Sequence, residues 1–236
     1  KNSIVCAGTY GKTTTAALMT WILRETGYNP SYMFGGIAKN EMEAARLLTP
    51  PLPSNGWSVL EGDEYKTSRW DERPKFAHYP VTHLLLTSVV WDHADVYPTV
   101  VDYINVFQQL YDSVPPTGVR IISEKVKGVI DFKGQNFISY GKNSDNTYRY
   151  RDVKQTDRGV IFTIESAGRS FEINTPMLGD FTADNMTGCF ALAREIGIGE
   201  NDIIRAISAF GGIRRRLEKR YAGRVTIFDD IAHSPT

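Results

Sequence analysis

One stretch near the start of the chain has the residues of a phosphate-binding loop. Residues 4–15 read Ile-Val-Cys-Ala-Gly-Thr-Tyr-Gly-Lys-Thr-Thr-Thr. Gly8 and Gly11 let the backbone approach phosphate closely, and the N–H groups at a helix N-terminus point at the anion. Lys12 would reach the β- and γ-phosphates, and the hydroxyl of Thr13 would bind the accompanying magnesium ion. The stretch therefore predicts a nucleoside triphosphate site, although Cys6 replaces a glycine of the general motif; an ordinary strand-to-helix turn is the alternative.

A group of acidic residues follows a predicted buried strand at residues 57–60. Glu61 is closest to the strand end, and Asp63 and Glu64 come after it. Ligands of open α/β sheets lie beyond the carboxyl ends of parallel strands, so Glu61 is the first candidate for an oxygen ligand of the magnesium ion. For Asp63 and Glu64 we expect a solvated acidic loop, the usual state of isolated carboxylates.

The next predicted strand, at residues 83–87, leads to the sequence Trp-Asp-His-Ala-Asp at residues 91–95. His93 can present a neutral imidazole to a cation, but magnesium prefers oxygen ligands. From chemistry alone, a structural role is therefore the expectation for His93, as it is for His78 and His83.

These candidate residues need a scaffold in which several strands end at one edge. Strand-like runs alternate with helical patterns, which is typical of a parallel sheet covered on both faces. Strands are expected at residues 4–7, 32–34, 57–60, 83–87, 119–123 and 137–140, and helices at 12–26 and 99–114. In the second helix the positions at helical spacing should be core: Val100, Ile104, Phe107, Tyr111 and Val114.

The pattern changes near Asn143. Strand-like segments at 148–153, 160–165 and 170–173 predict an antiparallel meander packed beside the main sheet. Helices return at 183–196 and 201–210, and a strand at 225–228 follows the basic run at 211–220. That run is either a solvated face or a clamp on the γ-phosphate. The predicted fold class is α/β: a P-loop-type, mostly parallel sheet with helices on both faces, plus a small antiparallel β-meander.

Composition limits the possible partners and compartments. The chain has 236 residues, with 27 Lys and Arg against 27 Asp and Glu, so no net field would gather nucleic acid or an acidic membrane. We expect no nucleic-acid partner and no membrane association. Cys6 and Cys189 are far apart in sequence, which suits reduced thiols and the cytoplasm. The first strand begins at once and a strand has just ended where the chain stops, so both ends look cut from something longer.

Six motifs occur in the order found in Mur ligases, and the chain resembles that superfamily over its whole length. They are residues 7–15, 61–65, 91–98, 179–185, 214–218 and 229–236. Within the superfamily, residues 35–37, 61–65 and 75–79 are most similar to the branch that joins UDP-N-acetylmuramate to a murein tripeptide in peptidoglycan recycling. The branch that joins UDP-N-acetylmuramate to L-alanine shares most of the motifs and is the alternative.

The resemblance implies a three-domain enzyme that uses ATP and Mg²⁺. Residues 1–222 would be the central ATPase domain, with the meander within about 146–175, and residues 223–236 the start of a truncated C-terminal ligase domain. The N-terminal UDP-binding domain and most of the domain for the amino substrate would lie outside this chain. The chain alone would then bind ATP weakly and not ligate.

The resemblance also assigns roles to individual residues. Lys12 matches the phosphate-binding lysine, Thr13 and Glu61 match the ligands of one magnesium ion, and His93 matches the ligand of a second. Lys12, His93 and Arg216 are the expected catalytic residues. The expected nucleotide-binding residues are Gly8, Thr9, Gly11, Lys12, Thr13, Thr14, Asn185, Arg216 and Asp230. Of these, Asn185 would contact adenine and Arg216 an ATP phosphate, while Asp230 and His233 would lie between domains.

Two departures from the family pattern affect this assignment. Phe181-Thr182 stands where the family commonly has His-Asn or Phe-Asn, which removes one polar group near adenine. Several family members also carry a carbamylated lysine after the Asp-His motif, but no lysine occurs between Lys75 and Lys125, and Gln108 lies near that place. A second metal ion would therefore need other ligands.

The implied reaction is ATP-driven amide-bond formation through an acyl phosphate. Two rivals use the same phosphate cradle: a small-molecule kinase of the P-loop type, and a nucleotide-dependent switch or binding module. The kinase would not need the Asp-Asp-Ile-Ala-His sequence at 229–233, and no guanine-reading Asn-Lys-x-Asp motif supports a GTPase switch.

Overall fold

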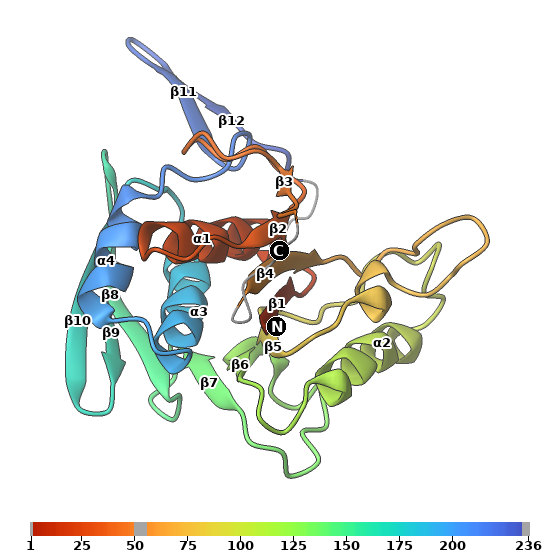
Figure 1. Ribbon diagram of the computed structural model, residues 1–236. Helices are drawn as coiled ribbons and strands as arrows, with labels where there is room; N and C mark the ends of the chain where they lie inside the picture. Colours follow the sequence, from red (N-terminus) through yellow and green to blue (C-terminus); the bar gives the residue numbers. More distant parts are fainter. Residues whose placement is uncertain (1, 50–55, 233–236) are drawn as a thin grey trace.

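A ten-stranded sheet forms the centre of the computed structural model, which describes residues 2–49 and 56–232 (Figure 1). The strands lie in the order β10-β9-β8-β7-β6-β5-β1-β4-β2-β3. Their bounds are β1 Asn2–Ala7, β2 Ser31–Met33, β3 Ala45–Arg46, β4 Trp57–Gly62, β5 His83–Leu86, β6 Arg120–Ser123, β7 Ile138–Gly141, β8 Tyr148–Thr156, β9 Gly159–Ser166 and β10 Arg169–Thr175. The predicted fold class, a mostly parallel α/β sheet, is confirmed.

Strand β1 lies between β4 and β5 and is parallel to both. Ala7 pairs with Gly62 on one side and with Leu86 on the other, so three strands end at the same level. Each of the three chemically interesting segments of the sequence follows one of these strand ends. The sheet therefore brings residues 8–13, 61–65 and 87–95 to one edge, as the rule for parallel sheets predicts.

Helices cover both faces of the sheet (Figure 1). The helices α1 (Lys12–Glu25), α3 (Phe181–Glu195) and α4 (Glu200–Ala209) pack on one face, where Ile4 and Cys6 of β1 point. Helix α2 (Val100–Ser113) and the short 3₁₀ helix η1 (Lys75–His78) pack on the other, with Val5 and Ala7. The alternation of side chains along β1 thus supplies a separate apolar core to each face.

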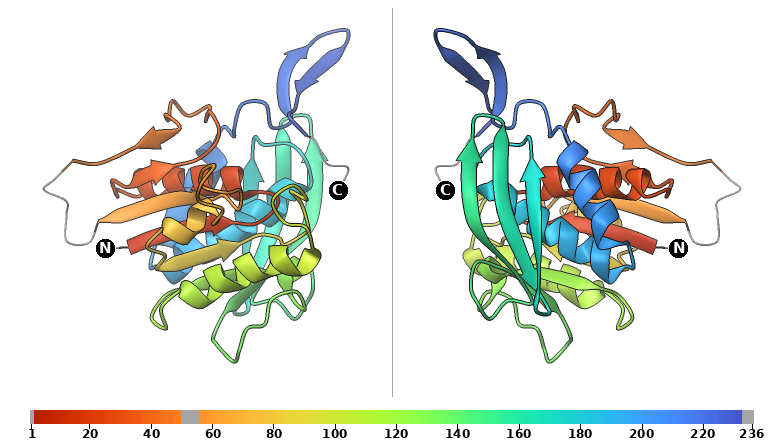
Figure 2. Two further views of the ribbon diagram at one scale, coloured as in Figure 1. Left: turned by 90° about the vertical axis from the view of Figure 1, so that its right-hand side faces the viewer. Right: turned by 90° about the vertical axis from the view of Figure 1, so that its left-hand side faces the viewer.

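The antiparallel meander is confirmed in β8, β9 and β10, but its placement differs from the prediction. It does not pack beside the main sheet; it extends it, because β8 pairs in parallel with β7 through Tyr148 and Tyr140. The right-hand view of Figure 2 shows these long strands beside α4, which packs against β10. Helix α3 packs on β6, β7 and β8, so one helix covers the junction between the parallel and antiparallel parts.

The predicted helix at 99–114 is present as α2, with one error in its core. Phe107 and Tyr111 are fully buried, but Val100 is 47% exposed because it lies in the first turn, before the helix reaches the sheet. A capping box begins the helix: the Thr99 hydroxyl accepts from the N–H of Asp102, and the Asp102 carboxylate accepts from the N–H of Thr99.

This capping box gives a stability prediction. In Thr99→Ala the N–H of Asp102 loses its side-chain acceptor, so the free energy of unfolding should fall by about 1 kcal/mol. Urea unfolding followed by circular dichroism measures the loss. Thr99→Ser keeps the hydroxyl and is the matched control; an equal loss in both variants would contradict this account.

A hairpin of two strands, β11 (Glu218–Ala222) and β12 (Thr226–Asp229), projects from the body of the molecule in every view (Figures 1 and 2). The prediction had a strand at β12 but none at β11, which lies in the basic run. Charged residues in this segment do not alternate with apolar ones, so the sequence does not show the period-two pattern of a half-buried strand. Pairing with β12 forms the strand, since Glu218 pairs with Asp229 and Ala222 with Thr226.

Candidate active site

Gly8 and Gly11 shape the loop between β1 and α1. Their φ angles are 132° and 86°, a region that favours glycine. A Cβ atom on Gly8 would lie 2.3 Å from Oγ1 of Thr87 and 2.8 Å from backbone atoms of Ser88. A Cβ atom on Gly11 would lie 2.4 Å from Oδ1 of Asn185. The loop is therefore a close-packed cradle with no room for side chains at these two positions.

The start of α1 is available to an anion. No side chain caps this helix within the described part of the chain, and its first backbone hydrogen bond runs from the N–H of Thr15 to the carbonyl of Gly11. The preceding helical N–H groups thus have no acceptor in the helix. The loop itself is fixed, because the N–H groups of Thr9 and Tyr10 donate to Ser88. A rigid loop and a partially positive helix end together suit a phosphate group.

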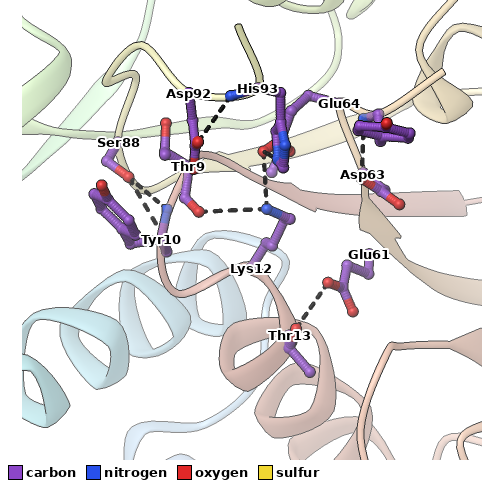
Figure 3. A network of polar contacts seen from close by, with 12 residues as sticks. Thr9, Tyr10, Lys12, Thr13, Glu61, Asp63, Glu64, Ser88, Asp92 and His93 are labelled. Atoms are coloured by element: carbon purple, nitrogen blue, oxygen red, sulfur yellow. Dashed lines mark hydrogen bonds and ion pairs between the residues drawn. The ribbon is translucent and has the colours of Figure 1, made fainter. Parts of the chain in front are cut away.

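Lys12 reaches back over this cradle. Its Nζ donates to Oε1 of Glu64 at 3.0 Å and to the carbonyl of Thr9 at 3.3 Å (Figure 3). The side chain is only 17% exposed, so the ammonium group is held close to the helix end instead of pointing into solvent. A phosphate bound at the N-terminus of α1 would meet this positive charge.

The burial of Glu64 differs from the sequence-based expectation. It was expected in a solvated loop, but it is completely buried. Its Oε1 accepts from Lys12 and, at 3.3 Å, from the hydroxyl of Tyr103, while Tyr97 donates to its backbone carbonyl. Burial raises the pKa of Glu64, and the charge of Lys12 opposes that rise. No local pattern marks this residue, because the side chains that bury it come from α2 and the segment before it.

Glu61 and Thr13 are brought together as the sequence predicts. The Thr13 hydroxyl donates to Oε1 of Glu61 at 2.7 Å (Figure 3). The N–H of Gly35 donates to Oε2 of Glu61 at 2.5 Å. One carboxylate therefore links the first turn of α1 to the loop after β2. A hydroxyl and a carboxylate in contact beside a phosphate cradle are the donor set that magnesium takes.

His93 lies on the other side of Lys12. Its Nε2 is 3.6 Å from Oε1 of Glu64, and its ring meets Tyr65 edge to face with centroids 5.2 Å apart. The backbone φ of His93 is 55°, and its N–H donates to the side chain of Asp92 at 2.7 Å. With this backbone conformation the imidazole lies among the polar side chains around Lys12 and Glu64, and not in the apolar core.

Asp63 was also expected to be solvated, and it is instead paired. Lys75 of η1 donates to Oδ2 of Asp63 at 2.5 Å, and the N–H of Tyr65 donates to Oδ1 at 3.0 Å. Burial would raise the pKa of Asp63, but these hydrogen bonds hold it below its usual value. The pair anchors the loop after β4 to η1, and leaves Glu61 and Glu64 as the carboxylates nearest to the cradle.

The protein side chains provide only part of a metal coordination shell. Within residues 2–49 and 56–232, no three His, Cys, Asp or Glu side chains form a cluster that could hold a metal ion. Magnesium normally keeps several waters and takes oxygens from the nucleotide phosphates, so one or two protein ligands are enough beside a phosphate cradle. The donors present therefore fit magnesium carried by a nucleotide and do not fit a closed structural metal site.

The sequence of this chain matches the family model described as the Mur ligase middle domain over residues 6–193. The match includes the cradle, both carboxylates, His93 and most of α3. The chain belongs to the Mur ligase family.

Curated relatives agree with this family. The chain is 32% identical over 235 residues to the UDP-N-acetylmuramate–L-alanyl-gamma-D-glutamyl-meso-2,6-diaminoheptandioate ligase of Escherichia coli, covering 99% of this chain and 50% of the relative. It is 30% identical to the UDP-N-acetylmuramate–L-alanine ligase of Pelagibacter ubique, again covering 99% and 50%. The chain thus spans about half the length of the curated relatives it matches.

Solved structures of murein peptide ligases share the fold. The enzyme described as UDP-N-acetylmuramate:L-alanyl-gamma-D-glutamyl-meso-diaminopimelate ligase from Neisseria meningitides superposes with a TM-score of 0.77 at 26% identity, covering 90% of this chain and 67% of that one. The murein peptide ligase of Psychrobacter arcticus gives 0.76 at 26% identity, covering 100% and 52%.

Of the remaining residues assigned from the Mur ligase resemblance, Asn185 borders the cradle, whereas Arg216 lines a hollow to which no residue of the cradle loop contributes, and Asp230 follows β12. Asn185, in the first turns of α3, is almost completely buried beside Gly11. Arg216 lines a hollow of about 90 Å³ with Lys39, Arg158 and other residues, and makes no hydrogen bond or ion pair with any described residue. Asp230 is exposed beyond β12, where its carboxylate accepts from the N–H of Ala232. His233 lies outside the described residues.

Gln108 stands near the place of the carbamylated lysine found in several Mur ligases, but it has another role here. Its Nε2 donates to the carbonyl of Asp131 at 2.8 Å, and its Oε1 accepts from the N–H of Asp131 at 2.9 Å. Both polar ends of Gln108 therefore bind a surface loop.

In the part of the chain that the structure describes, no helix is long and apolar enough to span a membrane.

Gly8 gives a prediction for the cradle itself. In Gly8→Ala the new Cβ would collide with backbone atoms of Ser88 at 2.8 Å, and the φ of 132° is unfavourable for alanine. We expect a loss of about 1–3 kcal/mol in the free energy of unfolding, together with weaker nucleotide binding. Differential scanning fluorimetry with and without ADP measures both. Gly27→Ala, where a Cβ would contact nothing within 4 Å despite a φ of 87°, separates backbone strain from collision.

Proposed function

We propose that this chain is the ATP-binding part of a ligase that joins UDP-N-acetylmuramate to the tripeptide L-alanyl-γ-D-glutamyl-meso-diaminopimelate, as in peptidoglycan recycling. One observation carries the proposal: a phosphate cradle that carries Lys12 and has Thr13 hydrogen-bonded to Glu61, in a Mur ligase chain whose E. coli relative is named for this reaction. ATP and Mg²⁺ are the proposed cofactors.

The proposed reaction has to bring a carboxylate up to the strongly negative end of ATP. Magnesium, when bound, would neutralise phosphate charge. The muramoyl carboxylate would attack the γ-phosphorus of ATP and release ADP, giving an acyl phosphate, and the peptide amine would then attack the acyl carbon and displace phosphate. Thr13 and Glu61 would hold one ion, Lys12 would hold the β- and γ-phosphates, and Arg216 would contact an ATP phosphate. The N–H groups at the start of α1 hold phosphate oxygens and need no reorganisation during the reaction. Asn185 would bind adenine, and His93 would hold a second ion.

We propose that residues 1–222 act as the central ATPase domain and residues 223–236 as the start of a C-terminal ligase domain. The relatives are about twice as long as this chain, which supports further domains that bind UDP-N-acetylmuramate and the amino substrate. In this arrangement the hairpin β11–β12 lies across the boundary, and Asp230 lies between domains. We place the reaction in the cytoplasm, where ATP is available and where Cys6 and Cys189, both free and buried, would stay reduced.

A second candidate reaction differs only in its amino substrate. The relative from Pelagibacter ubique, at 30% identity, is named as a ligase for L-alanine. The domain that would select the amine is not part of this chain, so the ATP site suits both reactions equally well.

Phosphate release tests both candidates in the full-length parent enzyme. The enzyme is mixed with UDP-N-acetylmuramate, ATP and magnesium, and either the diaminopimelate tripeptide or L-alanine is added. Release with the tripeptide alone supports the recycling ligase, and release with L-alanine alone supports the biosynthetic one. Release with neither would overturn the proposed function.

A further inference from the structure

The segment that carries Arg216 lies between α4 and β11, outside the helices and the main sheet. We call this segment, residues 210–217, the linker. Its backbone turns sharply, with φ angles of 88° at Gly212 and 60° at Arg215. The Arg216 side chain lies in a hollow that is lined by the linker itself and by Lys39, among other residues. The position of Arg216 therefore depends on what holds the linker backbone.

The loop after β2 lies against the linker, close to the base of the hairpin (Figure 1). We call residues 35–40 the β2 loop. The Asn40 side chain donates from Nδ2 to the carbonyl of Ala209 at 2.8 Å, and its Oδ1 accepts from the N–H of Gly211 at 2.6 Å. Two backbone hydrogen bonds continue the contact, from the N–H of Lys39 to the carbonyl of Gly212 at 2.9 Å and from the N–H of Arg214 to the carbonyl of Ile37 at 2.8 Å. One amide side chain thus fixes the point where α4 passes into the linker.

The other end of the β2 loop is attached to Glu61 and Thr13. The N–H of Gly35 donates to Oε2 of Glu61 at 2.5 Å. A Cβ atom on Gly36 would lie 2.8 Å from Cγ2 of Ile213 and 3.1 Å from Cγ2 of Thr13. Gly36 is therefore packed between the linker and the first turn of α1. One short loop connects the linker to both residues that are proposed to hold magnesium.

We propose that Asn40 is a positioning residue for the ligation reaction. Through the β2 loop, it holds the linker, and with it Arg216, in a fixed place relative to Thr13 and Glu61. The inference rests on the proposed function, since it assumes that Arg216 contacts an ATP phosphate and that Glu61 holds the accompanying ion.

The physical reason is preorganisation. A cation stabilises charge on a reacting phosphate best when it is already in place, and a misplacement of about 1 Å can cost on the order of a hundredfold in rate. The β2 loop ties the arginine and the carboxylate to the same stretch of backbone, so that neither moves without the other. The bond from Gly35 to Glu61 is charge-assisted, which makes it one of the stronger kinds of hydrogen bond.

The same connection predicts coupling between the metal and the linker. An ion on Glu61 fixes the carboxylate that accepts from Gly35, and the β2 loop passes that order on to the linker. Coupling between two sites is reciprocal, so the ion should order the linker as much as an ordered linker favours the ion.

A double-mutant cycle in the full-length parent enzyme tests the positioning role. We expect Asn40→Ala to lower kcat for ligation about tenfold. Arg216→Ala should lower kcat by at least the same factor, because it removes the group that Asn40 places. The double variant should then be no slower than Arg216→Ala alone, since Asn40 acts through the arginine. General structural damage by Asn40→Ala would instead lower the rate by the same factor in both backgrounds.

Asn174→Ala is the matched control for Asn40→Ala. Asn174 is an exposed asparagine on β10, outside the linker and the β2 loop. Its removal should leave kcat at the wild-type value.

Hydrogen exchange of the full-length enzyme is the second measurement, and it does not require that an Asn40 variant folds. With Mg²⁺ and a saturating non-hydrolysable ATP analogue, the amides of Gly211 and Arg214 should exchange about tenfold more slowly than in the free enzyme. Glu61→Gln should lose this protection under the same conditions, although the analogue still occupies the cradle.

The outcomes separate the two proposals. Equal rate losses from Asn40→Ala in the wild-type and Arg216→Ala backgrounds, or equal protection of the linker in wild type and Glu61→Gln, would overturn the positioning role and leave the proposed function intact. A wild-type enzyme that releases phosphate with neither acceptor would instead overturn the proposed function, on which the positioning role depends.

Discussion

Lys12→Ala in the full-length enzyme should lower the rate of ligation by a hundredfold or more. Lys12 is the one side-chain cation in contact with the cradle loop among the described residues, through the carbonyl of Thr9 at 3.3 Å. Removing one preorganised charge from a site where negative charge develops typically costs on the order of a hundredfold or more in rate. Steady-state phosphate release with saturating substrates measures the effect.

The ion pair between Lys12 and Glu64 provides a control for this variant. Lys12→Ala leaves the buried carboxylate of Glu64 without its cation, and breaking a buried pair costs about 3–5 kcal/mol of stability when the remaining charge stays uncompensated. The double variant Lys12→Ala/Glu64→Gln removes that charge, so it should regain stability but not activity. Ligation by either variant at the wild-type rate would contradict the role of Lys12.

Glu61→Gln should have the second largest effect on ligation, also on the order of a hundredfold, with a higher magnesium concentration needed for half-maximal activity. Glutamine keeps the size of the side chain and one carbonyl oxygen, so an acceptor for either Thr13 or Gly35 remains, but the negative charge for the metal is lost. A magnesium titration of the ligation rate measures both changes.

Glu25→Gln is the matched control for Glu61→Gln. Glu25 is the last residue of α1 and is exposed, at the opposite end of the helix from Thr13. Its removal should change neither the rate nor the magnesium dependence. An unchanged magnesium dependence in Glu61→Gln would show that this carboxylate does not hold the ion.

The sequence by itself determined the features that depend on neighbours along the chain. The glycines, Lys12 and Thr13 lie within one turn of a helix start, so their spacing alone fixes the cradle. The order of strands and helices predicts a mostly parallel sheet, and the strand ends then bring Glu61 close to Thr13. Thr99 and Asp102 form a capping box for the same local reason.

Only the tertiary structure decided what depends on contacts between distant segments. Glu64 lies in an acidic run that looks solvated, yet it is buried against Lys12, 52 residues away, and Tyr103, 39 residues away. The meander joins the main sheet through backbone pairing of β7 with β8, and β11 is a strand only because β12 pairs with it. Local sequence records a residue's own preferences, whereas burial and strand pairing are set by the groups that packing brings against it.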